Sequence, residues 1–238
     1  MSPTPAEAPA APSTWPVLDT NERRVLGVLV EKSKTTPDAY PMSINALVTG
    51  ANQKSNRDPI LDLSDVDVQD ALASAQKKGL TIRVTGSGRV ERWKHAVYDA
   101  LKVGKVEAAL LTELLLRGPQ TEGELRGRAG RMEPIDDLDA LRAMLKPLAE
   151  RRLVVYLTPE GRRGTVLTHG FHAPDELERL RARYAGAALD DEPRPAPPPR
   201  PAPPPGEIDA LKQTVAALQA DLGAVKEELR ALKAALGM

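Results

Sequence analysis

The sequence predicts a mainly helical α+β protein in which two small domains of one plan precede a proline-rich linker and a C-terminal coiled-coil helix. Three observations lead to this prediction. A series of three short amphipathic helices and a β-hairpin occurs twice along the chain. Nine prolines lie within residues 190–206. Beyond them, apolar residues recur at spacings of three and four, which is typical of a coiled coil.

The composition sets limits on the kind of protein. The 238 residues are enough for one large or two small domains. Hydrophobic residues make up 41% of the chain but include one Phe and two Trp, so the cores must be largely aliphatic. Lys plus Arg and Asp plus Glu number 33 each, and this net charge of zero gives no overall attraction to nucleic acid, although a local basic patch stays compatible with it. The lack of cysteine excludes disulfides, thiolate nucleophiles and cysteine-ligated metal centres.

Residues 1–17 carry five prolines among small residues and are predicted to form a disordered arm. The arm lacks the basic and continuous apolar regions of a signal peptide. No stretch of the chain approaches the ~18 apolar residues needed to cross a bilayer. We therefore expect a cytoplasmic protein without membrane contact.

The first domain is predicted over residues 18–99. Its first helix begins at Asp19, which forms a capping-box pattern with Glu22, and ends near Lys34. Ser43 is a suitable N-cap for a short second helix. The apolar stripe of the first helix is Val25, Leu26, Leu29 and Val30.

A third helix and a hairpin complete this domain. Ser64 and Asp67 form another capping-box pattern, and the helix ends at residues 77–79 with two lysines and a glycine. The period then changes to two over residues 80–84, which predicts a strand with Leu80, Ile82 and Val84 on one face. After a Gly-Ser-Gly turn, residues 90–98 are predicted to form the returning strand.

The second domain, over residues 100–185, repeats this order. Its predicted elements are a helix over 106–117, a short helix capped by Thr121 and Glu124, a helix over about 136–151, and strands over 153–157 and 165–168. Val68, Leu72 and Leu80 match Leu141, Leu145 and Leu153 at one constant offset. Three helices followed by a hairpin is the winged helix-turn-helix plan, so we expect two tandem winged-helix domains. The hairpins would seal the helical cores whether or not they have a further role.

Residues 186–206 are predicted to form a proline-rich linker, in which residues 190–206 are a stiff polyproline II spacer. A ligand for an SH3-type domain is the alternative for this segment. Residues 207–238 are predicted to form a parallel coiled coil, because acidic g positions then meet basic e positions of the partner helix. A homodimer is the expected assembly, with a trimer left open and a helix folding back on the domains as the other alternative. The core positions are Ile208, Leu211, Val215, Leu218, Leu222, Val225, Leu229, Leu232 and Leu236.

The segment VLGVLVEKSKTTPDAYPMSINALVTGANQKSNRDP, residues 25–59, resembles the signature of the YceH-like family of uncharacterised bacterial proteins. Its most specific parts are residues 35–38, 40–41 and 52–59, and the likeness continues more loosely to about residue 184. One departure is Gly50-Ala51, where the family pattern has a Cys beside the Asn. The resemblance implies a tandem winged-helix fold and no established activity.

The densest polar segment is the loop from Asn52 to Pro59. Its side chains Asn52, Gln53, Lys54, Asn56 and Arg57 are candidates for contacts with phosphates or with a partner's backbone. The alternative is structural: the amides bond to the loop backbone, and Arg57 pairs with a nearby carboxylate. Both interpretations stay open at the level of sequence.

The third helices would read DNA in a winged helix, but their first halves are acidic. Aspartates repel phosphates there, which counts against insertion into the major groove. Arg142 and Lys146, with Gln69 and Gln76, are the exceptions. Basic residues of the hairpins are better candidates for a nucleic-acid backbone: Arg83, Arg89, Arg92 and Lys94 on the first, Arg162 and Arg163 on the second.

No motif of an enzyme, a nucleotide-binding loop or a metal site is found, so we expect a non-enzymatic protein without a cofactor. His169 and His172 stand three apart without an evident third metal ligand. The sequence favours a DNA-binding, regulator-like protein, and the alternative is a scaffold whose tandem winged helices dock a partner protein.

Overall fold

A computed structural model describes residues 15–84 and 91–185. Contacts divide the chain into two units, Met1–Asp190 and Asp191–Met238, and the described residues all belong to the first. Arg89, most of the predicted arm, and the whole of the predicted linker and coiled coil lie outside the described residues. Within the described ranges, none of the helices combines the length and the apolar character needed to cross a bilayer.

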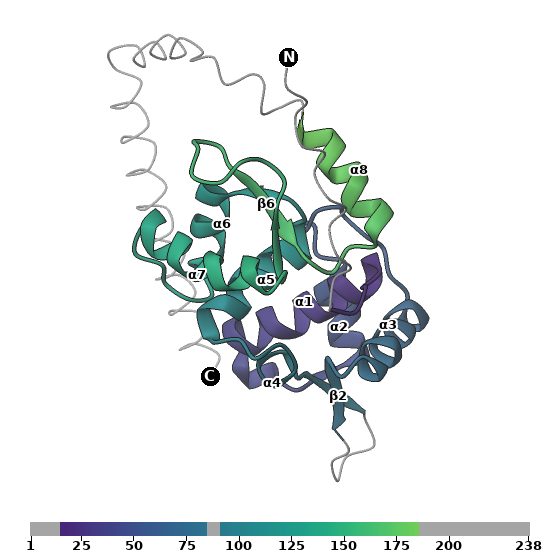
Figure 1. The fold of residues 1–238 in the computed structure, drawn as a ribbon. Helices are drawn as coiled ribbons and strands as arrows, with labels where there is room; N and C mark the ends of the chain where they lie inside the picture. The colour runs from purple at the N-terminus through teal and green to yellow at the C-terminus, as the bar shows by residue number, and fades with distance from the viewer. Residues whose placement is uncertain (1–14, 85–90, 186–238) are drawn as a thin grey trace, which may run out of the picture. The chain divides into compact units, whose positions relative to one another are not determined.

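The N-terminal half follows the predicted order, with additions (Figure 1). Asp19 and Glu22 form the predicted capping box, Ser43 caps the second helix, and Ser64 with Asp67 forms a second capping box, so the predicted helix starts are confirmed. The elements are α1 (Thr20–Thr35), the short 3₁₀ helix η1 (Pro37–Ala39), β1 (Met42–Ser43), α2 (Ile44–Ala51), α3 (Asp65–Lys77), β2 (Thr81–Val84), β3 (Arg92–His95) and α4 (Val97–Leu101).

The C-terminal half repeats this order and ends in one more helix. Thr121 and Glu124 form the predicted capping box, while Asp137 is the N-cap of the third helix. The elements are α5 (Lys105–Arg117), β4 (Gln120–Thr121), α6 (Glu122–Ala129), α7 (Leu138–Glu150), β5 (Val154–Tyr156), β6 (Val166–His169) and α8 (Pro174–Ala185).

Each half holds a three-stranded antiparallel sheet, in the orders β1-β3-β2 and β4-β6-β5. The outer strands β1 and β4 were not predicted, because two residues are too few to show a period of two. Met42 pairs with Trp93, and Gln120 pairs with Leu167, so in each half the residues just before the second helix join the hairpin. The predicted two-stranded hairpins are therefore three-stranded sheets.

Three details of the first hairpin and of α7 differ from the prediction. The returning strand ends at His95, and Val97 begins α4, whose Val97 and Leu101 are buried in the core. On β2, Thr81 is buried and Ile82 is 41% exposed, because the Thr81 hydroxyl donates to the carbonyl of Leu72 at 3.0 Å. Leu138, an apolar residue of the predicted third helix, is 39% exposed because α7 begins there, at the surface.

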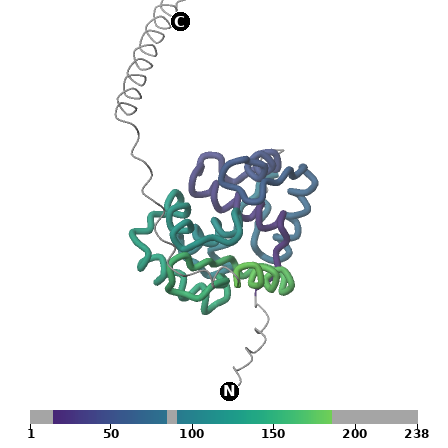
Figure 2. Tube along the Cα trace, turned by 90° about the horizontal axis from the view of Figure 1, so that it is seen from above, coloured from purple at the N-terminus to yellow at the C-terminus, as the bar shows by residue number. Residues whose placement is uncertain are grey.

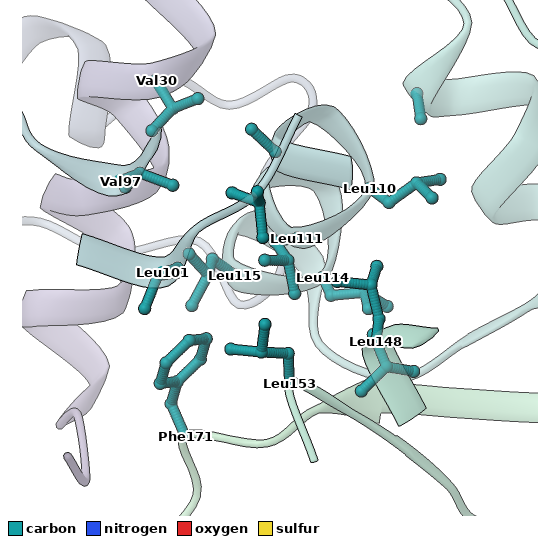
Figure 3. Packing of buried hydrophobic residues seen from close by; sticks show 14 of the residues in the cluster. Val30, Val97, Leu101, Leu110, Leu111, Leu114, Leu115, Leu148, Leu153 and Phe171 are labelled. Carbon is teal, nitrogen blue, oxygen red and sulfur yellow. The ribbon is translucent and has the colours of Figure 1, made fainter. Parts of the chain in front are cut away.

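The two halves share a core along α1 and α5. Val30 and Val97 from the first half lie in one cluster with Leu111, Leu153 and Phe171 from the second (Figure 3). Conversely, Leu116 of α5 lies in the cluster of the first half. α1 and α5 approach so closely at Gly27 that a Cβ there would lie 2.8 Å from the side chain of Leu116. Glycine at this position therefore permits the helices to cross.

Candidate functional site

The third helices lie on opposite sides of the central pair α1 and α5 (Figure 1). Figure 2 shows the two halves of the described chain next to each other, the first in purple to blue and the second in teal to green. α3 packs against α1 and α2, while α7 packs against α5 and α6. Each third helix therefore turns one face to the core and leaves the other on the surface.

The exposed face of the first module is acidic and partly apolar. Residues 58–76 contain five aspartates and no lysine or arginine. Ile60 and Val66 are 63% and 64% exposed, more than any other large apolar side chain among the described residues. We call the exposed residues Ile60, Asp62, Asp65, Val66 and Asp70 the acidic ridge. The sequence did not predict the acidic ridge. The positions of apolar residues along a helix do not show which side of that helix another part of the protein covers.

The exposed face of α7 differs in charge. Arg142, a predicted contact residue, donates to Glu122 Oε2 through Nε and Nη2 at 2.9 and 2.8 Å, and Asp139 lies 3.7 Å from its Nη1. The side chain of Lys146 is exposed. An open hollow at the start of α7 is lined by Arg126, Asp136, Asp137, Leu138, Asp139 and Arg142. Its acids and bases stand side by side, so this face has no single sign of charge.

The Asn52–Pro59 loop is held by its own polar side chains. Asn52 both donates to and accepts from the backbone of Leu63, at 2.9 and 2.8 Å. Arg57 is buried and donates to Glu31 at 2.5 Å, to the Gly50 carbonyl at 3.0 Å and to Gln53 Oε1 at 3.1 Å. These are the structural contacts weighed in the sequence analysis, and Lys54 is the candidate of the loop whose side chain is exposed.

The same loop contacts the second half. Asn56 adopts a left-handed conformation, with φ of 59°, and its Oδ1 accepts from Arg117 Nη2 at 2.5 Å. The backbone N–H of Asp58 donates to the Leu116 carbonyl at 3.0 Å. Arg24, which is buried, donates to the Pro59 carbonyl at 2.5 Å, and burial lowers its pKa to about 10. The loop therefore joins α1, α2 and α5.

Two buried carboxylates share one arginine between the halves. Arg131 Nη2 lies 2.6 Å from Glu31 Oε1 and 2.6 Å from Glu113 Oε1. Glu31 and Glu113 each stand five residues before the C-cap of their helix, Thr36 and Gly118, so they are equivalent positions of the repeat. Burial raises the pKa of the Glu31 carboxyl, but Arg57 and Arg131 outweigh it and hold that pKa below its ordinary value.

The basic candidates of the hairpins that the structure describes are exposed, with different contacts. Arg83 pairs with Glu91 at 2.9 Å, and Arg92 donates to the Pro41 carbonyl at 2.8 Å. Lys94 is exposed on β3. Arg162 and Arg163 are exposed in the turn between β5 and β6, where Gly161 and Gly164 adopt positive φ values of 78° and 79°. Of the predicted basic contacts, these two lie at a loop tip.

A buried histidine cluster was not predicted beyond its spacing. His172 Nε2 lies 2.9 Å from Thr168 Oγ1, its Nδ1 accepts from Arg23 Nη1 at 2.8 Å, and Glu176 lies 3.1 Å from that Nδ1. His169 stacks on His172 with ring centroids 3.9 Å apart. A hydroxyl, an imidazole and a carboxylate in this order resemble a hydrolytic triad. Thr168 is fully buried in β6, however, and a nucleophile must reach its substrate, so the cluster fastens α8 to α1.

Among residues 15–84 and 91–185, no group of three or more His, Asp or Glu side chains is arranged to hold a metal ion.

The lowered pKa values of all three histidines predict that the protein is less stable in acid. Burial lowers the pKa of His95 to about 4, with Lys34 and Lys94 adding to the effect. Burial likewise lowers the pKa of His169 and that of His172, and the positive charge of Arg23 lowers both further. The unfolded chain therefore binds more protons than the folded one once the pH falls below about 6.5, and the free energy of unfolding decreases from there downward.

Urea unfolding at pH 7.5 and 5.5 measures this effect, because the carboxylates titrate in lower pH ranges. The chain should be less stable at pH 5.5, and His172→Gln should reduce the difference between the two pH values. Equal or greater stability at pH 5.5 would show that the imidazoles are not buried as described.

Comparison with known proteins places these features in a wider group. Residues 18–163 match the family model described as "Protein of unknown function, DUF480". The chain is 45% identical over 179 residues to a UPF0502 protein of Rhodopirellula baltica, covering 74% of this chain and 75% of that protein. It is 44% identical over 180 residues to a UPF0502 protein of Citrifermentans bemidjiense, covering 74% and 84%. A UPF0502 protein of Xanthomonas campestris is 40% identical over 221 residues, covering 91% and 96%.

Proposed function

Because this chain belongs to the DUF480 family, whose description names no activity, we propose a function from its geometry: a non-enzymatic scaffold of two winged helices that docks partner proteins on its third helices. The order helix, strand, helix, helix, strand, strand occurs twice, with a three-stranded antiparallel sheet each time. This order supports the tandem winged-helix interpretation, with domains over residues 18–99 and 100–185.

The observation that carries the docking role is the chemistry of the exposed third-helix faces. A helix that reads DNA bases needs cations and amides near its N-terminus. α3 instead follows a segment of aspartates, and Arg142 of α7 is neutralised by Glu122 and Asp139. Phosphates would be repelled by the first face and would gain little from the second. Protein partners suit both faces better.

Contact with a nucleic-acid backbone is the second candidate, and Arg162 with Arg163 is the observation that favours it. Both side chains are exposed at a loop tip and carry no ion pair to a described residue. A basic hairpin tip of this kind can lie along phosphates without reading sequence.

Titration with random duplex DNA at several salt concentrations separates the two candidates. The scaffold predicts no binding at micromolar protein in low salt, and no change in Arg162→Ala plus Arg163→Ala. Binding that weakens steeply with salt, with a log–log slope reduced by roughly 1–2 in the double variant, would instead establish the nucleic-acid role. Lys77→Ala plus Lys105→Ala serves as the matched control, since it removes two exposed cations that are not candidate contacts.

In this proposal the predicted coiled coil of residues 207–238, which lies outside the described residues, joins two copies of the chain. A parallel homodimer would present each docking face twice. Weak contacts at single faces would then combine through effective concentration.

A further inference from the structure

We infer that the acidic ridge is a docking surface for a basic amphipathic segment of a partner protein. The inference rests on the proposed scaffold function and adds to it the face used and the chemistry of the segment bound. It is drawn from exposure, from charge and from a comparison of the two third helices.

The apolar part of the ridge is the first step. Six large apolar side chains among the described residues are exposed, and the two most exposed of them, Ile60 and Val66, both belong to the ridge. Ile60 precedes α3, and Val66 lies in its first turn, so neither serves the buried stripe of Val68, Leu72 and Ala75. A partner that covers them removes apolar surface from water, which favours binding.

The acidic part of the ridge is not explained by the needs of α3. Asp67 serves the capping box with Ser64, and Asp65 suits the positive end of the helix dipole. Asp62 lies before the helix and Asp70 in its second turn, where neither role applies. No described lysine or arginine forms an ion pair with Asp62, Asp65 or Asp70, whereas the acids of the protein interior are paired.

The second module shows that this face is not a requirement of the fold. With the offset that relates Val68 to Leu141, Asp70 corresponds to Ala143, Ala73 to Lys146 and Gln69 to Arg142. α7 therefore has an alanine in place of Asp70 and cations in place of Gln69 and Ala73, while its start is acidic as well, with Asp136, Asp137 and Asp139. Both helices fold and pack in the same way. The charge of the ridge is therefore not needed for folding, and we attribute it to the binding of a partner.

Charge complementarity selects the occupant. Nucleic acid and anionic lipid would both be repelled by an anionic face. An acidic partner would be repelled in the same way. A segment with lysines or arginines on its flanks and an aliphatic stripe between them satisfies both parts of the ridge.

The test uses the full chain and three synthetic peptides of about 14 residues. The first places Leu and Lys on opposite faces of a helix, the second has Glu in place of every Lys, and the third keeps the composition of the first with Leu and Lys dispersed. Fluorescence anisotropy gives the affinities, and two-dimensional NMR of the labelled chain locates the peptide. We expect the first peptide to bind at the ridge and the other two to bind at least about tenfold more weakly.

Variants identify the residues responsible. Asp62→Asn with Asp65→Asn and Asp70→Asn should weaken the first peptide at least about tenfold, and Ile60→Ser with Val66→Ser should do the same. The matched control is Asp136→Asn with Leu138→Ser and Asp139→Asn around the start of α7, which should change the affinity less than about twofold. Circular dichroism and thermal unfolding verify that all variants are folded.

The outcomes separate this inference from the scaffold proposal. Absence of binding by the first peptide, equal binding by the Glu peptide, or equal affinity for ridge and control variants overturns the inference. In those cases the scaffold proposal still stands or falls on the DNA titration. Binding lost in both ridge variants and kept in the control supports the inference whatever the partner's sequence.

Discussion

Gly170→Ala should lower the free energy of unfolding by at least about 3 kcal/mol, or prevent folding. A Cβ at residue 170 would lie 1.7 Å from the carbonyl oxygen of Arg152, far inside the contact distance of two atoms. The obstacle is backbone, which cannot rotate away as a side chain does. Residue 170 cannot retreat either, because its N–H donates to the Leu153 carbonyl at 2.8 Å and fixes the base of the β5–β6 hairpin.

Gly127→Ala is the matched control for this substitution. Gly127 lies in α6, and a Cβ there meets no atom within 4 Å, so alanine should leave stability unchanged or raise it by up to about 1 kcal/mol. Urea unfolding of both variants gives the comparison. Similar midpoints for the two would show that β6 and the preceding strand do not approach each other as described.

Arg57→Ala should lower the free energy of unfolding by about 3–5 kcal/mol, the range for breaking a buried ion pair by removing one partner. The side chains of Arg57 and Glu31 are 0% and 2% exposed, so solvent does not screen the pair. Removal of the guanidinium leaves Arg131 at 2.6 Å and Lys32 at 3.9 Å as the remaining cations at Glu31. It also removes the hydrogen bonds to the Gly50 carbonyl and to Gln53. The loop and the end of α2 both depend on these bonds.

Lys54→Ala, three residues away in the same loop, should change stability by less than about 0.5 kcal/mol because that side chain is exposed. Thermal unfolding followed by circular dichroism distinguishes the two variants. A loss below about 1 kcal/mol in Arg57→Ala would favour the other interpretation of the loop, in which its polar residues are available to a partner.

Much of the fold is encoded locally, and for that reason it was predictable. Each capping box is a pair of residues three apart, such as Ser64 and Asp67, so a helix start can be identified without knowledge of its neighbours. The repeat is also local, since Leu72 and Leu145 fill equivalent places in their own modules. The strands β1 and β4 were missed because they exist only through pairing with a distant strand.

The candidate site depended on contacts between distant residues, and sequence could not decide it. From the sequence, Arg57 suits a phosphate as well as a carboxylate. The structure shows that its partner is the carboxylate of Glu31, 26 residues earlier in the chain. Arg142 was a candidate for DNA until Glu122, 20 residues earlier, neutralised it. The exposure of Val66 followed from which side of α3 packs on α1. In each case the sequence showed the chemical type of the residue, but only the structure showed which residues surround it.

The single guanidinium between two equivalent glutamates has a consequence for how such a protein can evolve and be dissected. A duplicated gene segment ordinarily yields copies that can drift apart, be reshuffled or be produced one at a time. Here the two halves meet at equivalent positions, and Arg131 of the second half forms ion pairs with a buried glutamate of each half. Each half also contributes side chains to the apolar cluster of the other. We therefore expect the two halves to unfold together in a single cooperative transition.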